Sequence, residues 1–162
     1  MATIISLIPT RLRRITTVLG PYDGQPIREL FGTPKVATWI SDTLPGLPTE
    51  ENAGKPPDEE FDDLLFNYIS SKGEMRYEKM FKDLIPMRDE VWELKTYQLR
   101  IFGWFYRKDQ FIAVRPGRKA ELKNGSDAYY RAINAVLDTR AALPLDQPKF
   151  VGGVISNVIS GF

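Results

Sequence analysis

Apolar and polar residues alternate most regularly between Val91 and Lys119. An alternation with a period of two is typical of strands that bury one face against a core. The pattern is interrupted after residue 97 and again in the segment Arg107–Gln110, and Pro116 and Gly117 close it. It predicts three neighbouring strands over residues 92–97, 99–106 and 111–115, joined as an antiparallel meander.

The same alternation assigns side chains to the two faces of the predicted sheet. In the first strand, Trp92, Leu94 and Thr96 share one face, and Glu93, Lys95 and Tyr97 share the other. In the second strand, the first face carries Leu99, Ile101, Gly103 and Phe105, and the second carries Arg100, Phe102, Trp104 and Tyr106. We expect the apolar side chains of the meander to pack on Phe61 and Leu65, and on Tyr130 or Ile133.

Apolar residues at helical spacing predict helices on both sides of the meander. Pro34 suits the first position of a helix that continues to Leu44, and Asp58-Glu59-Glu60 provides the negative charge that favours a helix start. The latter helix has an apolar stripe that consists of Phe61, Leu64, Leu65, Tyr68 and Ile69, and Gly73 ends it. Further helices are predicted over Tyr77–Leu84 and over Asp127–Ala141, the last with Ser126 as its N-cap, and a single helical turn over Ile27–Phe31.

The rest of the chain completes the prediction of an α+β domain. Arg14–Leu19 has the pattern of a first strand, and residues 45–57 contain four prolines and no sustained apolar pattern, which indicates an exposed loop. We therefore expect one domain over residues 1–149, with an N-terminal arm and a small, mostly antiparallel sheet. Residues 150–162 form an apolar tail that is either docked or disordered, or that inserts into a partner.

Composition restricts the chemistry that this domain can perform. The 162 residues include no histidine and no cysteine, which excludes Ser-His-Asp triads, disulfides and the commonest zinc ligands. The net charge of +1 provides no general attraction to nucleic acid, but residues 88–131 contain ten basic and six acidic side chains. A local basic surface is therefore possible. Because no apolar run is long enough to span a bilayer, we expect a cytoplasmic protein that has no membrane partner. We also expect no cofactor.

The motifs of the meander resemble a known protein family. A W-E-L-K strand at Trp92–Lys95, an R-I-F strand at Arg100–Phe102 and a strand that ends in basic residues are similar to the RelE/ParE toxin superfamily, in particular its HigB-like, phage-associated branch. The resemblance covers mainly residues 58–142. It implies a β-α-α-β-β-β-α order and a metal-independent endoribonuclease of a toxin–antitoxin pair. Such a toxin cleaves mRNA on the ribosome and is restrained by an antitoxin-like partner.

The resemblance also implies roles for particular residues. Lys95, Arg100 and Arg118 take the positions of catalytic residues in this family. The residues expected to bind RNA are Arg107, Lys108, Arg115, Lys119 and Tyr129. RNA cleavage by attack of a ribose 2′-hydroxyl needs a base, cations for the developing phosphorane charge and an acid for the leaving oxygen. Lysine can act as the base when neighbouring cations lower its pKa, whereas arginine stabilises charge.

Two departures from the family pattern leave a second function open. The chain has Arg115-Pro116-Gly117 where the HigB-like branch has His-Gly-Phe, and Lys123-Asn124 where RelE has a tyrosine. Arg100 could instead pair with Glu93 on the neighbouring strand, and the other basic residues could simply face solvent. The alternative is a phage or prophage protein with a toxin fold that has lost catalysis and binds another protein or has a structural role.

Overall fold

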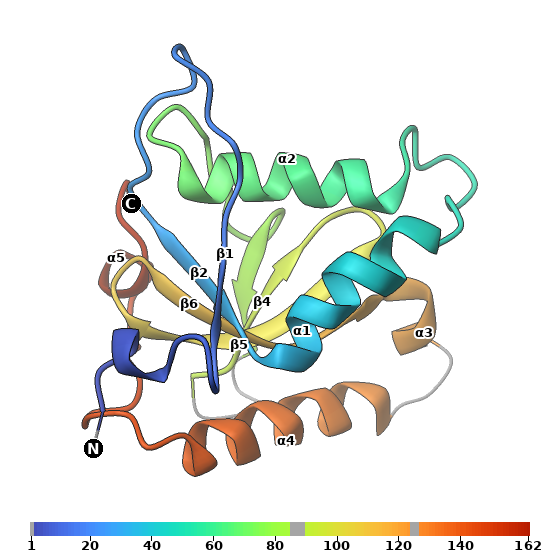
Figure 1. Ribbon diagram of the computed structural model, residues 1–162. Helices are drawn as coiled ribbons and strands as arrows, with labels where there is room; N and C mark the ends of the chain where they lie inside the picture. The colour runs from blue at the N-terminus through green and yellow to red at the C-terminus, as the bar shows by residue number, and fades with distance from the viewer. Residues whose placement is uncertain (1, 85–89, 124–126) are drawn as a thin grey trace.

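The fold is organised around a sheet that links distant parts of the chain. The computed structural model describes residues 2–84, 90–123 and 127–162, and these form a six-stranded sheet in the order β1-β2-β6-β5-β4-β3 (Figure 1). The strands are β1 (Arg13–Ile15), β2 (Glu29–Gly32), β3 (Phe81–Asp83), β4 (Trp92–Lys95), β5 (Leu99–Arg107) and β6 (Gln110–Arg118). Strands β2 and β6 are parallel, and all other neighbours are antiparallel.

Helices cover both faces of this sheet. The α-helices are α1 (Pro34–Thr38), α2 (Pro57–Ile69), α3 (Lys119–Lys123), α4 (Asp127–Ala142) and α5 (Ile155–Val158). Helix α2 lies over one face and α4 over the opposite face (Figure 1). Shorter helical turns occur at Ile5–Leu7, Trp39–Thr43 and Leu44–Gly46. The expectation of an α+β fold with a mostly antiparallel sheet is therefore confirmed.

The predicted meander is present as β4, β5 and β6. Its alternation divides the core as expected, because Leu99, Ile101 and Phe105 pack on the α2 side while Phe102 and Trp104 pack on the α4 side. The register shifts between Phe102 and Gly103, opposite a bulge in β6. Gly103 is required there, because a Cβ atom at this position would lie 2.0 Å from the carbonyl oxygen of Ile112.

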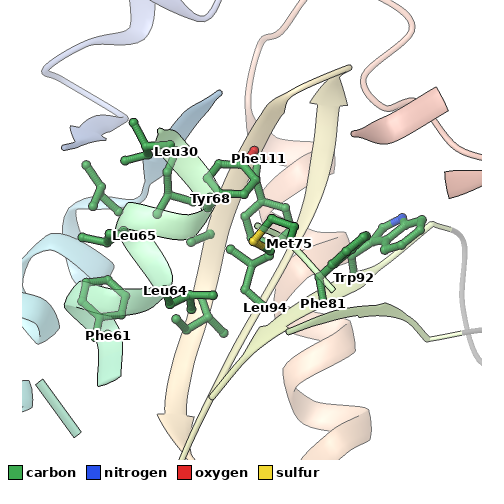
Figure 2. Close-up of a cluster of buried hydrophobic side chains, with 14 of the residues drawn as sticks. Leu30, Phe61, Leu64, Leu65, Tyr68, Met75, Phe81, Trp92, Leu94 and Phe111 are labelled. Carbon is green, nitrogen blue, oxygen red and sulfur yellow. The ribbon is translucent and has the colours of Figure 1, made fainter. Parts of the chain in front are cut away.

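Helix α2 also follows its prediction. Pro57 occupies its first turn, three acidic residues follow, and the whole stripe of Phe61, Leu64, Leu65, Tyr68 and Ile69 is buried. These side chains pack on Leu94 and Phe111 of the sheet (Figure 2). The helix ends at Ile69 rather than near Gly73, because Ser70 is already extended.

Two predicted helical segments are strands in the structure. Phe81–Asp83 is strand β3, paired with β4, and its Phe81 side chain lies in the α2-side core. Glu29–Gly32 is strand β2, with Leu30 in the α2-side core and Phe31 in the α4-side core. Strand β2 is buried on both faces, and such a strand appears in the sequence as a short apolar run, which periodicity does not distinguish from a helical turn.

Two smaller expectations also need correction. Strand β1 ends at Ile15 and does not continue to Leu19. Ile133 packs on the α4-side core and not with Phe61 and Leu65, and Tyr130 is 48 % exposed. The expected N-cap at Ser126 lies outside the described residues.

Both ends of the chain take part in the core. Near the N-terminus, Ile4, Leu7 and Leu12 pack in the α4-side core. In the C-terminal tail, Val158 and Ile159 are fully buried on the α2 side, and the backbone N–H of Ser160 donates to the carboxylate of Asp109. The tail is therefore a packed part of the fold. None of the described helices is long and apolar enough to cross a membrane.

Candidate functional site

The register of the meander brings several predicted site residues to one end of the sheet. Lys95 on β4 is the direct neighbour of Arg100 on β5, and Glu93 is the neighbour of Phe102. On the other side of β5, Arg115 on β6 is the neighbour of Phe102. Because cross-strand neighbours point to the same face, these side chains share the face that α4 covers. The structure thus places Lys95, Arg100 and Arg115 on one side of the sheet.

Arg100 is largely committed to contacts within the protein. Its Nη1 atom donates to the carbonyl oxygens of Thr96 and Leu99, each at 2.7 Å. Its Nε atom lies 4.0 Å from Oε1 of Glu93, and the residue is only 9 % exposed. The cross-strand pairing with Glu93 is therefore present, and Arg100 holds the turn between β4 and β5.

Glu93 is the carboxylate at the centre of this group. It is 3 % exposed, and the Tyr129 hydroxyl donates to its Oε2 atom at 3.5 Å. Burial raises the pKa of the Glu93 carboxyl, although the nearby charges of Arg100, Lys95 and Lys82 act in the opposite direction. Glu93 was not expected from the sequence to have a functional role beyond pairing with Arg100.

The two remaining members of the group face outwards to different extents. Lys95 is partly exposed. Desolvation lowers the pKa of its ammonium group, the charges of Arg100 and Lys82 also lower it, and the Glu93 charge raises it. Tyr129 on α4 is half-buried and packs edge-on against Phe102, with ring centroids 5.3 Å apart. Burial and the Glu93 charge raise the pKa of the Tyr129 hydroxyl, so it keeps its proton at neutral pH. We call Glu93, Lys95, Arg100 and Tyr129 the strand-end cluster.

A small basic cavity adjoins the strand-end cluster. Arg115 and Arg118 from β6 and Arg131 from α4 line a cavity of about 150 Å³, together with the ring of Phe102. Glu121 is the acidic residue that lines it. Arg131 was not predicted as a site residue, because only the docking of α4 on β6 brings it to the two strand arginines. Its sequence position, on the helix that follows the basic strand, is the one signal that could have suggested it.

Lys95 and Arg100 line a larger cleft. It has a volume of about 580 Å³ and lies between α2, residues 78–80 and the β4–β5 turn. Lys119 lines this cleft, and its ammonium lies 5.4 Å from the centre of the Tyr97 ring. Glu60 and Asp63 of α2 and Glu78 also line the cleft, so its charge is mixed.

Arg107 and Lys108 lie away from the other predicted site residues. They are at the β5–β6 hairpin, seven and eight residues along from Arg100, which in an extended strand is a separation of roughly 24 Å or more. The Arg107 guanidinium stacks 4.0 Å from the centre of the Tyr106 ring and donates to the carbonyl of Pro148. The structure therefore does not combine these two residues with the strand-end cluster.

Two further findings concern metal ligands and similarity to known proteins. Within the described part of the chain, no three His, Cys, Asp or Glu side chains are grouped so that they could hold a metal ion. Comparisons with protein-family models, with curated proteins and with solved structures found no match for this chain.

Proposed function

We propose that this chain is a RelE/HigB-like endoribonuclease that binds mRNA, blocks translation and is restrained by an antitoxin-like protein. The observation that carries the proposal is the strand-end cluster. It combines a lysine of lowered pKa, a buried carboxyl of raised pKa and a tyrosine hydroxyl, next to a basic cavity. The pKa values of Lys95 and Glu93 are both shifted towards neutrality, and groups of this kind are suited to proton transfer.

The order of the elements supports the same proposal. If β1, β3 and the short helices α3 and α5 are set aside, the remaining elements β2-α1-α2-β4-β5-β6-α4 follow the β-α-α-β-β-β-α order that the resemblance implies, with β2 in the place expected for Arg14–Leu19. The two additional strands, β1 and β3, lie at the outer edges of the sheet. They extend the sheet at its edges without separating β2, β6, β5 and β4.

The strand-end cluster can supply each role in the proposed reaction. A bond forms between the ribose 2′-oxygen and phosphorus, and the bond from phosphorus to the leaving oxygen breaks. Lys95 in its neutral form accepts the 2′-hydroxyl proton, and Tyr129 donates a proton to the leaving oxygen. Glu93, when protonated, donates to the Tyr129 oxygen. Lys95 is a cation once it has accepted the 2′-hydroxyl proton, and this charge stabilises the phosphorane. Arg100 is a positioning residue that holds the turn and lowers the pKa of Lys95.

The proposal is tested by expressing the protein in bacterial cells and mapping mRNA ends. The wild type is expected to stop growth and to cut mRNA. Lys95→Ala and Tyr129→Phe should each lower cleavage about a hundredfold, since one proton-transfer group typically contributes at least that factor. Lys72→Ala, at an exposed lysine after α2, is the matched control and should cut like the wild type. A wild-type protein that never cuts RNA would overturn the proposal.

One observation favours the alternative of a non-catalytic, protein-binding module from a phage or prophage. The segment between β1 and β2 projects beside α2 (Figure 1), and its Val18 and Tyr22 are 96 % and 91 % exposed. Exposed apolar side chains on a projecting segment are typical of protein contacts. If the wild type leaves mRNA intact but a Val18→Ser, Tyr22→Ser variant loses a binding partner, the alternative holds.

A further inference from the structure

We propose that Arg115, Arg118 and Arg131 form a binding site for one phosphate group, separate from the group that Lys95 acts on. We call it the arginine pocket. Its anion affinity follows from the residues themselves, whereas the assignment of that phosphate to an RNA chain rests on the proposed function.

Two elements converge to build the arginine pocket. Arg115 and Arg118 lie among the last residues of β6, on either side of Pro116 and Gly117, and both line the cavity. Arg131 reaches the same cavity from the second turn of α4. The cavity of about 150 Å³ can admit a phosphate group but not a whole nucleotide, since sites for drug-sized ligands begin near 300 Å³.

The charges of the pocket are not balanced within the protein. Among the described residues, none of these three arginines forms an ion pair, and Glu121 is the single acidic side chain in the lining. Three arginines and one glutamate thus give this cavity an excess of positive charge, which a bound oxyanion would offset. Guanidinium groups hold phosphate oxygens through paired N–H donors, so the pocket has the chemistry of a phosphate site.

The place of the pocket distinguishes it from the strand-end cluster. The Phe102 ring lines the pocket, and Tyr129 packs on that ring while its hydroxyl points to Glu93. In the sheet Phe102 stands between Arg115 and Glu93, because it is the cross-strand neighbour of both. A phosphate in the pocket would lie next to the reacting phosphate and would fix the position of the chain.

Binding of small anions tests the pocket independently of catalysis. Affinity for inorganic phosphate and pyrophosphate is measured by calorimetry and by thermal shift for the wild type, Arg115→Ala and Arg131→Ala. Both variants should bind at least tenfold more weakly, and Arg131→Lys should recover little because the paired donors are lost. Arg11→Ala removes the same charge from an exposed position on the N-terminal segment and should bind like the wild type. Equal losses in Arg11→Ala and Arg131→Ala, or no anion binding by the wild type, would overturn the pocket.

Short RNAs then identify the kind of phosphate and separate the two proposals. Tighter binding of a 5′-phosphorylated trinucleotide than of its 5′-hydroxyl form, lost in Arg131→Ala, assigns the pocket to a terminal phosphate. Equal binding of the two, again lost in Arg131→Ala, assigns it to an internal phosphodiester. A protein that binds phosphate through Arg131 but never cleaves RNA retains the pocket and loses the proposed activity. If the wild type cleaves RNA and Arg131→Ala binds RNA as tightly as the wild type does, the proposed activity is retained and the arginine pocket is overturned as an RNA site.

Discussion

Glu93 is a buried carboxyl group whose charged neighbours are mostly cationic. Its pKa is raised, because the effect of burial outweighs the opposite effect of those positive charges. A raised pKa means that the folded protein binds this proton more tightly than the unfolded chain does. The contribution of Glu93 to stability is therefore complete below pH 4.5 and is lost as the pH rises through its folded pKa.

Replacement of Glu93 by Gln should remove this pH dependence. The free energy of unfolding of the wild type should fall, relative to that of Glu93→Gln, as the pH rises from about 4.5 towards neutrality, because Gln does not ionise. Urea unfolding at several pH values measures the difference. Glu51→Gln, at an exposed position, serves as the control. A difference that stays constant, or that changes in the opposite direction, would contradict this account.

Replacement of Arg100 should lower the stability of the protein, whereas replacement of Arg115 should weaken anion binding and leave stability nearly unchanged. Arg100→Ala removes donors to two carbonyl groups and leaves Glu93 with weaker compensation, so a loss of about 3 kcal/mol in unfolding free energy is expected. Arg115→Ala, at an exposed position, should change stability by less than about 0.5 kcal/mol. Thermal and denaturant unfolding of both variants checks this. If Arg100→Ala is as stable as Arg115→Ala, Arg100 is not a positioning residue.

At the scale of elements, the meander and α2 could be predicted from the sequence because each buries one face. The period of two in β4 and β5, and the stripe from Phe61 to Ile69 in α2, survive as sequence patterns. Strand β2 is buried on both faces, and β3 is three residues long, so neither leaves a distinct period. Those two strands are recognisable only from their partners, β6 and β4.

The candidate site was predictable to the extent that strand register determines it. Lys95 and Arg100 are adjacent because the short turn after β4 fixes the register of β5. Arg131 and Tyr129 reach the same region only because α4 packs on the sheet at a particular position, which the helix pattern does not specify. The burial of Arg100 likewise follows from the carbonyl groups of the turn, which a sequence pattern does not reveal.

The C-terminal tail is an element whose contribution to stability can be measured directly. Ile159 is fully buried among core residues, so Ile159→Ala should cost about 3 kcal/mol through lost burial and the cavity left behind. Val154→Ala, at a position that is 65 % exposed in the same tail, should be nearly neutral. Denaturant unfolding of the two variants compares them. A tail that is unimportant for folding would give equal, small effects.

At the scale of the whole molecule, the net charge of +1 does not describe the surface that would meet RNA. Acidic residues gather on α2 and the loop before it, over one face of the sheet, while the arginine pocket lies beside α4. The two helices are on opposite faces (Figure 1), so the protein has a favourable and an unfavourable side for a polyanion. Binding of RNA should therefore depend on a few phosphate contacts rather than on a general field.

The salt dependence of RNA binding counts these contacts. For a single-stranded RNA, the slope of log K against log salt concentration changes by about 0.7 for each phosphate contact, through counterion release. Arg115→Ala and Arg131→Ala should each reduce the slope, by a combined total of no more than about 0.7 if they hold the same phosphate. Two separate phosphates would instead give about 0.7 for each variant and twice that for the double variant. Arg11→Ala should leave the slope unchanged, because its exposed side chain lies on the N-terminal segment and outside the pocket. Fluorescence anisotropy over a range of salt concentrations makes the measurement. A slope that falls equally in all three variants would show that diffuse charge, and not the arginine pocket, holds the RNA.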